Sequence, residues 1–455
     1  MRFNPHIKDL IGKYNKPGPR YTSYPTAPQF SNTVNSRDLI SHIGSTGSPV
    51  SLYLHIPFCQ SNCWFCGCNT IITTRRKQAD AYLDLLRKEV DLLAGQVGGR
   101  VDVRQIHFGG GTPNFLSVAQ FQTLFSTLRS SFDLSKLHEL SVELAPSDLS
   151  EEQLDVLVDN GLTRASFGIQ DVQDEVQKAI NRIQPHEINQ QVMQWLRDRG
   201  IKSINVDLIY GLPYQNPDSY EETLDKIMEL DPDRLAVFNY AHVPHLKPYQ
   251  KKLENHPMPS PETRVDMLLG IIDYLTQSGY QFIGIDHFAK PDDELCLAQK
   301  ESRLHRNFQG YTVQDEDEVI GLGISSISET PRSYRQNVKT FADYEAKISS
   351  ESWPIERGIV LTDDDLIRRK MIRSVMCNMK LDFEGLAKQI DDAGEIEQIH
   401  SNAIPTLREM EKDGLIRNHS WGFEVTETGR LFLRNISMIF DAYLGKSDAK
   451  YSRTV

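Results

Sequence analysis

The densest chemistry in the chain lies in residues 53–68, which read YLHIPFCQSNCWFCGC. Cys59, Cys63, Cys66 and Cys68 follow one another with the spacing Cys-x3-Cys-x2-Cys-x-Cys. A short loop brings the first three thiolates together at little entropic cost, so that they can hold three irons of a four-iron cluster. The fourth iron then has no protein ligand and can bind a small molecule. The pattern therefore predicts an iron–sulfur site that performs chemistry.

Zinc and disulfides are the two other uses of clustered cysteines. A zinc ribbon needs a second pair of Cys or His ligands farther along the chain, and the sequence offers neither. A disulfide framework needs an oxidising compartment, and we expect no secretory leader in residues 1–14. Cys296 and Cys377 stand alone and are expected to be small core residues.

Length and charge limit the remaining classes. A chain of 455 residues predicts one large catalytic domain of barrel size and a smaller appendage. The net charge of -12 repels nucleic acid and anionic membranes, and no apolar run is long enough to span a bilayer. We expect a cytoplasmic protein that binds neither nucleic acid nor membrane.

Short β-rich runs alternate with amphipathic helical stretches along most of the chain. Leu83, Leu86, Val90 and Leu93 share one helical face, and Gly95 offers a stop. Repeated βα units predict parallel strands, which can form either an open doubly wound sheet or a curved partial barrel. The predicted strands are 51–55, 103–108, 139–143, 164–169, 203–208, 234–239 and 281–286.

Glycines and polar side chains follow several of these strands. Gly109 to Thr112 come after the second strand, where backbone without side chains can approach a ligand closely. Glu143, Gln170 and Asp207 stand at the ends of later strands. The carboxyl ends of parallel strands meet on one side of a sheet or barrel, so these residues indicate one site.

The cysteine segment resembles that of the radical S-adenosylmethionine (SAM) enzymes, and within them the oxygen-independent coproporphyrinogen III oxidase family. The likeness runs nearly the full length, through PGPRYTSYPT at 17–26, QFIGIDHF at 281–288 and HRNFQGY at 305–311. Three cysteines alone would indicate only the superfamily. Cys68 and the run at 19–26 narrow the resemblance to this family.

The resemblance implies an α/β fold, a partial (β/α)6 barrel with a smaller, mostly helical C-terminal domain. We expect an N-terminal extension at 1–35 packing on the barrel, the barrel at 36–355, and a helical cap at 356–455. In the cap, Thr362 begins a helix with an acidic first turn, and later a hairpin precedes a final helix from Thr428. This order resembles a winged helix, but the segment is not strongly basic and is expected to cover the substrate cavity.

The resemblance also assigns roles to residues. Cys59, Cys63 and Cys66 would bind the [4Fe–4S] cluster and, with Tyr53, form the catalytic set. The residues expected to bind SAM are Tyr53, Phe65, Cys68, Gly110, Gly111, Thr112, Glu143, Gln170, Arg182, Asp207, Ala241 and Ile327. Two positions depart from the family pattern: Ala145 replaces an expected aspartate, and Trp64 replaces a common tyrosine.

The implied reaction begins when an external one-electron donor such as a flavodoxin reduces the cluster. Reductive cleavage of SAM yields a 5′-deoxyadenosyl radical, and a second SAM is expected beside the first. The radical attacks the ring A and B propionates of coproporphyrinogen III, which become the vinyl groups of protoporphyrinogen IX in haem biosynthesis. Because the chain is acidic overall, the substrate carboxylates would need a local cluster of Arg and Lys. We expect a monomer.

Two other functions stay open. A related haem chaperone would carry haem without decarboxylation, but such relatives typically lack Cys68 and the run at 21–25. A zinc-binding interaction module with a regulatory winged helix would hold tetrahedral zinc. Arg20, Tyr21 and Tyr24 belong either to a surface-wrapping extension or to a lid over the barrel mouth.

Overall fold

The computed structural model describes residues 6–446 and 451–455, apart from positions 45, 46, 48, 98–100, 315–317, 391 and 392. The chain forms two compact units. The barrel unit comprises Ser31–Met267 and Glu316–Val360, and the terminal unit comprises Met1–Phe30, Leu268–Asp315 and Leu361–Val455. The division into 1–35, 36–355 and 356–455 stays a prediction.

The barrel unit is built on a continuous set of parallel strands. In spatial order these are β1 (Val50–Ile56), β4 (Val103–Gly110), β5 (Glu139–Leu144), β6 (Arg164–Gln170), β7 (Ser203–Tyr210) and β8 (Arg234–Asn239). Each contains one of the first six predicted strands, so these predictions are confirmed. Because all the strands run the same way, their carboxyl ends share one side of the barrel.

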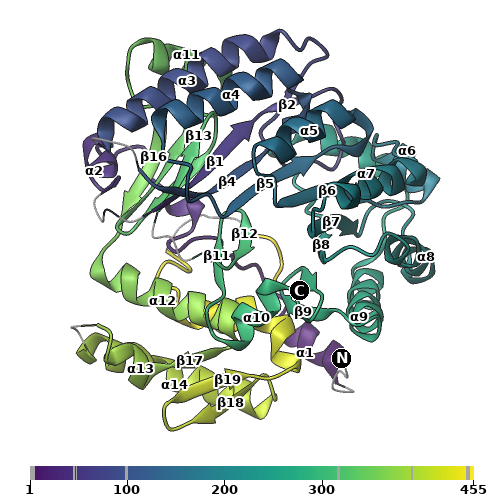
Figure 1. Ribbon diagram of the computed structural model, residues 1–455. Coiled ribbons are helices and arrows are strands. Elements are labelled where there is room, and N and C mark those ends of the chain that lie inside the picture. Colours follow the sequence, from purple (N-terminus) through teal and green to yellow (C-terminus); the bar gives the residue numbers. More distant parts are fainter. Residues whose placement is uncertain are drawn as a thin grey trace. The chain divides into compact units, whose positions relative to one another are not determined.

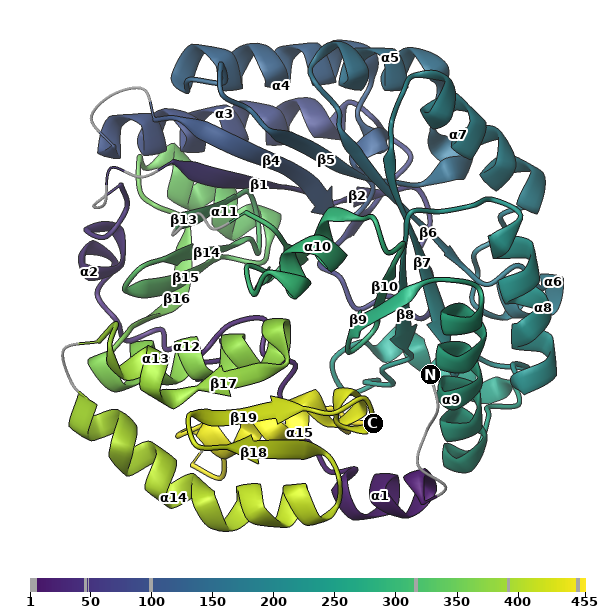
Figure 2. The same ribbon diagram turned by 60° about the horizontal axis from the view of Figure 1, so that its bottom comes forward.

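Helices cover the outer side of these strands, as Figures 1 and 2 show. Ser117 and Ser150 begin α4 and α5 with complete capping boxes, which satisfy backbone N–H groups of the first turn. The predicted apolar face of α3 is buried, but Gly95 does not end this helix, which continues to Gln96. The helices are α3 (Gln78–Gln96), α4 (Val118–Ser131), α5 (Glu151–Asp159), α6 (Asp174–Ala179), α7 (His186–Asp198) and α8 (Pro217–Met228).

Apolar and polar residues alternate along the parallel strands. In β1, Leu52, Leu54 and Ile56 are fully buried, while Tyr53 and His55 on the opposite face contact polar residues of the barrel interior. The same alternation continues in β4, β5, β6 and β7. One face therefore packs on helices, and the other lines a polar interior.

The parallel set continues beyond β1 into strands that the sequence analysis did not predict. β13 (Glu318–Leu322) pairs with β1 in parallel, and β14 (Ile327–Thr330), β15 (Ser333–Asn337) and β16 (Ile355–Val360) follow as antiparallel neighbours. Buried Glu89 of α3 accepts hydrogen bonds from the Tyr344 hydroxyl at 2.6 Å and the Asn337 amide at 2.7 Å. These bonds fix α11 (Phe341–Ser349) and β15 against α3.

The terminal unit has the predicted mostly helical character. It contains α1 (Ile7–Tyr14), α10 (Glu294–Lys300), α12 (Asp363–Asn378), α13 (Phe383–Ala387), α14 (Ala393–Lys412) and α15 (Leu433–Ser437). Thr362 caps α12 as predicted, with its side chain accepting from the Asp365 N–H. A small sheet has the order β17 (Lys380–Asp382), β19 (Gly422–Val425), β18 (Ile416–His419), which includes the predicted hairpin.

Two predicted elements of this unit are wrong in detail. The seventh strand is not part of the parallel series, because β9 (Gln281–Gly284) pairs with β10 (His287–Ala289) in antiparallel fashion. The chain turns at Gly284 and Ile285, which both have positive φ. The final helix begins as a 3₁₀ turn at Thr428–Phe432 before α15.

The N-terminal segment packs on the C-terminal part of its own unit. Tyr21 donates to Asp441 Oδ2 at 2.9 Å, and the Tyr24 hydroxyl accepts from the Ala442 N–H at 2.9 Å. The Arg434 guanidinium donates to the Pro19 carbonyl at 2.9 Å. Both tyrosines are buried, which supports the wrapping alternative, and a lid role stays a prediction.

Among the residues that the structure describes, no helix has the combination of length and apolar character that crossing a membrane requires.

Candidate active site

The cysteine loop follows β1 and is fixed by backbone hydrogen bonds on two sides. β2 (Phe58–Cys59) pairs with β3 (Ile71–Ile72), and the Thr73 N–H donates to the Cys59 carbonyl at 2.9 Å. The Trp64 N–H donates to the Ile180 carbonyl at 2.9 Å, and the side-chain Nδ2 of Asn181 donates to the Asn62 carbonyl at 2.9 Å.

A third segment, residues 247–250, supports the second half of the loop. Lys247 Nζ donates to the Cys68 carbonyl at 2.6 Å, and the Tyr249 hydroxyl donates to the Cys66 carbonyl at 2.6 Å. Gln250 Nε2 donates to the Phe65 carbonyl at 2.9 Å. These three bonds hold the second half of the loop in place.

The thiols of this loop have polar neighbours. Cys59 Sγ lies 3.5 Å from Thr112 Oγ1, and Arg182 Nη1 lies 3.7 Å from Cys63 Sγ. Burial raises the pKa of Cys59 to about 11 and also raises the pKa of Cys63. The hydrogen bond with Cys68 lowers the pKa of Cys66 to about 6. A bound metal would displace the protons of its thiol ligands.

Zinc and a four-iron cluster require different arrangements of thiolates. Within the described ranges, no three His, Cys, Asp or Glu side chains converge on one point that could hold a metal ion. Zinc needs four ligands around one centre, whereas a four-iron cluster needs each thiolate on a different iron. Cys59, Cys63 and Cys66 lie on one hydrogen-bonded loop beside the Arg182 cation, and their role as cluster ligands stays a prediction.

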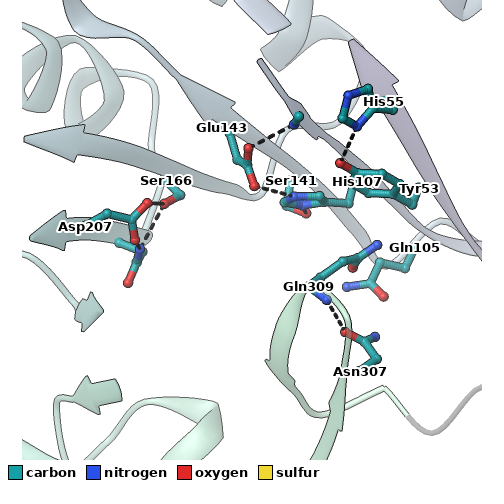
Figure 3. Close-up of polar contacts among 12 residues, drawn as sticks. Tyr53, His55, Gln105, His107, Ser141, Glu143, Ser166, Asp207, Asn307 and Gln309 are labelled. Atoms are coloured by element: carbon teal, nitrogen blue, oxygen red, sulfur yellow. Dashed lines mark hydrogen bonds and ion pairs between the residues drawn. The ribbon is translucent and has the colours of Figure 1, made fainter. Parts of the chain in front are cut away.

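Aromatic side chains of β1 and β4 form a row inside the barrel (Figure 3). The Tyr53 ring stacks on His107, with 5.8 Å between ring centroids and 17° between planes. His55 Nε2 lies 3.0 Å from the Asn69 carbonyl, which can only accept, so His55 Nδ1 accepts from the Tyr53 hydroxyl at 3.0 Å. Burial lowers the pKa of His55, in agreement with this neutral form. Tyr53 is therefore held in one orientation.

Glu143 lies at the carboxyl end of β5, beside the glycines of β4. Its carboxylate accepts from the Gly110 N–H at 3.1 Å and lies 3.3 Å from His107 Nε2, as Figure 3 shows. Burial acts to raise the pKa of Glu143, but the hydrogen bonds from His107 and Gly110 outweigh it and the pKa is lowered. A Cβ on Gly109 would lie 3.0 Å from this carboxylate. Glu143 thus presents an ionised group that can accept from a ligand amine.

The predicted glycine turn joins β4 to the cysteine loop. The Gly111 N–H donates to the Ile56 carbonyl and the Thr112 N–H donates to the Phe58 carbonyl, each at 2.8 Å. A Cβ on Gly111 would lie 2.7 Å from the Phe58 carbonyl oxygen. Glycine is needed here because the two backbones touch.

Gln170 and Arg182 each have a buried polar atom that lacks a partner among the residues the structure describes. Gln170 ends β6 with a φ of 70°, a strained conformation for a residue with a side chain. Arg182 Nη2 donates to the Gly168 carbonyl at 2.6 Å. Gln170 Oε1 and Arg182 Nε find no hydrogen-bond partner in the described part of the chain. A polar ligand that reached these two atoms would satisfy them.

Asp207 lies within β7, which continues beyond it to Tyr210, so it is not at the strand end as predicted. Its carboxylate accepts from Asn205 Nδ2 at 2.8 Å and from Ser166 Oγ at 3.2 Å (Figure 3). Burial, aided by the charge of Glu143, raises the pKa of Asp207 to about 6. The group is placed to accept hydrogen bonds from hydroxyl groups of a ligand.

The remaining predicted residues lie on separate elements. Phe65 packs with Ile180 and Leu253, and Cys68 is exposed at the end of the loop. Ala241 follows β8, where its carbonyl accepts from Gln250 at 3.3 Å, and Ile327 begins β14. The roles assigned to these residues stay predictions.

Both departures from the family pattern are accommodated. The Asn114 side chain donates to the Ala145 carbonyl at 3.0 Å and accepts from its N–H at 2.9 Å, so the backbone remains fixed without a carboxylate at this position. Lys252 Nζ lies 4.6 Å from the centroid of the Trp64 ring, a cation–π contact that an aromatic residue supports.

Several residues of this site were missed from the sequence. His55 and His107 orient Tyr53 and Glu143, Ser141 lies 2.7 Å from His107 Nδ1, and Ser166 and Asn205 bind Asp207. All five lie on the polar face of the parallel strands. The alternation of polar and apolar residues within those strands was the signal that could have identified them.

Comparison with known proteins first defines the class. Residues 53–227 match the radical SAM superfamily. The oxygen-independent coproporphyrinogen III oxidases of Synechocystis sp. and Escherichia coli are 44% and 45% identical to the chain. Each alignment covers 96% of the chain and 95% of the relative. The solved coproporphyrinogen III oxidase of Escherichia coli, described as a radical SAM enzyme, has a TM-score of 0.90 at 42% identity, covering 96% of the chain and 99% of that structure.

The fold and the cysteine loop are therefore those of a radical SAM enzyme, a class that uses SAM and a [4Fe–4S] cluster. Within this class, the chain belongs to the oxygen-independent coproporphyrinogen III oxidase family. The resemblance inferred from the sequence is confirmed, as is the predicted partial barrel with a helical appendage.

Proposed function

We propose that the chain converts the ring A and B propionates of coproporphyrinogen III to vinyl groups without oxygen, giving protoporphyrinogen IX in haem biosynthesis. The observation that carries the proposal is the placement of the cysteine loop beside the polar interior of a barrel whose relatives are oxidases of this name. The related haem chaperone remains the alternative.

The cofactors have candidate ligands among the residues described above. When bound, the cluster and SAM supply a 5′-deoxyadenosyl radical that removes hydrogen from the propionate β-carbon. Cys59, Cys63 and Cys66 would hold the cluster. Glu143 and the backbone at Gly110 and Gly111 would bind the amino and carboxylate ends of SAM. The other expected SAM contacts are Tyr53, Phe65, Cys68, Thr112, Gln170, Arg182, Asp207, Ala241 and Ile327.

The terminal unit offers a candidate for the substrate carboxylates. Arg306 of β11 (His305–Asn307) is 6% exposed, and its guanidinium lies 4.7 Å from the Tyr311 ring centroid. Its Nε and Nη1 atoms have no hydrogen-bond partner among the described residues. Burial raises the pKa of Tyr311, and the charges of Arg306, Arg430 and Arg20 oppose this shift; Arg20 itself pairs with Asp286. Two buried N–H groups without acceptors are costly, and a carboxylate would satisfy both of them.

Replacing Arg306 by methionine is expected to raise the KM for coproporphyrinogen III on the order of 10- to 100-fold with kcat changed only a few-fold. This range corresponds to the loss of one charge-assisted hydrogen-bonded contact. Steady-state kinetics and binding of oxidised coproporphyrin III by fluorescence would measure it. Arg306→Met should not lower the melting temperature, because the substitution removes two buried N–H donors that have no acceptor among the described residues.

Arg303→Met is the matched control, since Arg303 is 61% exposed and pairs with Glu301. Arg306→Lys should recover only part of the affinity, because an ammonium lacks the planar fork. An unchanged KM in Arg306→Met, together with a lower melting temperature, would show that Arg306 is structural.

The number of SAM molecules, the electron donor, the oligomeric state and the location are proposals as well. We propose two SAM molecules, an external one-electron donor such as a flavodoxin, a monomeric state and a cytoplasmic location without nucleic-acid or membrane binding. Equilibrium binding of SAM to the anaerobic, cluster-loaded protein would give the number of sites, and one site per chain would refute the second molecule.

Anaerobic turnover of the reconstituted chain with SAM, dithionite and coproporphyrinogen III tests the activity. Protoporphyrin should appear after oxidation of the product, together with 5′-deoxyadenosine. Haem binding without any porphyrin product would favour the chaperone.

A further inference from the structure

Several exposed apolar side chains lie on segments that are bonded to the cysteine loop. Among the described residues, the exposed large hydrophobic side chains are Ile72, Ile183, Leu246, Leu297 and Val360. Ile72 pairs with Cys59 across β2 and β3, Ile183 follows Arg182, and Leu246 precedes Lys247. Three of these five side chains therefore belong to segments bonded directly to the loop. Exposed large apolar side chains are a feature of interaction surfaces.

The same three segments are basic in a chain that is acidic overall. Residues 71–77, 178–183 and 246–252 contain no Asp or Glu, whereas the whole chain has a net charge of -12. Their cations are Arg75, Arg76, Lys77, Lys178, Lys247, Lys251 and Lys252, together with the half-buried Arg182 of the candidate active site. Lys178 forms an ion pair at 3.5 Å with Asp174, a residue that lies outside these segments. We call residues 71–77, 178–183 and 246–252 the loop collar.

A hollow adjoins one part of the collar. It has a volume of about 510 Å³ and is lined by Gln60, which follows Cys59, and by Arg76. Ser117 and Ser150, at the first turns of α4 and α5, also line it, so two helix N-termini meet there. The acidic residue Asp148 also lines the hollow. Helix N-termini with an arginine favour an acidic side chain of a partner, although Asp148 weakens this preference.

We propose that the loop collar is the docking surface for the electron donor, and that this donor is an acidic one-electron carrier protein. The inference rests on the proposed function, because an electron donor has to approach this loop only if the loop holds the cluster. Apolar contacts at Ile72, Ile183 and Leu246 would supply affinity, while the surrounding cations would orient an acidic partner and speed its association. Electron-transfer interfaces are small, so a few side chains suffice.

The test uses the full-length, cluster-loaded protein and a reduced acidic flavodoxin as the probe. Binding affinity and the rate of cluster reduction are measured for wild type, Ile183→Asp/Leu246→Asp and Arg75→Glu/Lys251→Glu. Each double variant should weaken binding and slow reduction by the flavodoxin at least about ten-fold, and added salt should slow the wild-type reaction. Reduction by dithionite should be unchanged, because a small reductant needs no docking surface.

Val360→Asp and Lys88→Glu are matched controls. Val360 is 38% exposed in β16, Lys88 is exposed in α3, and neither belongs to the loop collar. Two results would refute the docking surface. One is an equal loss of flavodoxin binding and reduction rate in the controls and the collar variants, and the other is unchanged flavodoxin binding in the collar variants. Failure of wild-type protein to form vinyl product would instead count against the proposed function, because binding and cluster reduction are measured without substrate.

Discussion

Replacing Cys63 by serine is expected to reduce anaerobic formation of protoporphyrinogen to less than about one thousandth of the wild-type rate. A serine hydroxyl does not replace a thiolate as an iron ligand, so the cluster should be lost together with its visible absorption. The loop itself should stay folded, because its backbone bonds to Ile180, Asn181 and Thr73 do not involve the Cys63 side chain. Iron content, absorption and turnover are measured on the same preparation.

Two further substitutions show whether the effect belongs to the predicted ligand set. Cys377→Ser removes a fully buried thiol from α12 and should retain iron and turnover, with a stability loss on the order of 1 kcal/mol. Cys68→Ser should retain iron as well, because Cys68 is expected to contact SAM and not the cluster. Loss of iron from Cys68→Ser with retention in Cys63→Ser would show that the ligand assignment is wrong.

The parallel strands were predictable because each is a short apolar-rich run that begins and ends within two residues of its predicted limits. Whether they form an open sheet or a barrel was left to the resemblance. The sequence did contain a local signal: Ser51, Tyr53 and His55 alternate with Leu52 and Leu54, although a doubly wound sheet is apolar on both faces. A polar face on parallel strands indicates an enclosed polar interior.

The features that could not be predicted depend on contacts between distant segments. β13 is a five-residue strand that pairs with β1 across more than half of the chain, and nothing within Glu318–Leu322 reveals that partner. The support of the cysteine loop by Lys247 and Tyr249 likewise consists of bonds from side chains to loop carbonyls. The unsatisfied donors of Arg306 become visible only after its surroundings are known.

Gly110→Ala is expected to weaken SAM binding on the order of 100-fold while leaving the iron content unchanged. Gly110 has a φ of 112°, which a residue with a Cβ adopts only with strain. The added Cβ would lie 2.6 Å from Cε1 and Nδ1 of His55, so the ring must move. Movement of His55 would break its bond with the Tyr53 hydroxyl, and movement of the turn would break the Gly110 bond to Glu143. Equilibrium binding of SAM to the cluster-loaded protein measures the effect.

Gly95→Ala is the matched control for this change. Gly95 lies in the last turn of α3, its added Cβ would meet nothing within 4 Å, and alanine favours the helix by up to about 1 kcal/mol. This variant should bind SAM as wild type does and be at least as stable. Glu143→Gln provides a second variant if Gly110→Ala folds poorly, since it keeps the shape of the side chain and removes the charge that would pair with the SAM amino group. Wild-type SAM affinity in both Gly110→Ala and Glu143→Gln would mean that SAM does not bind at this turn, whatever the iron content.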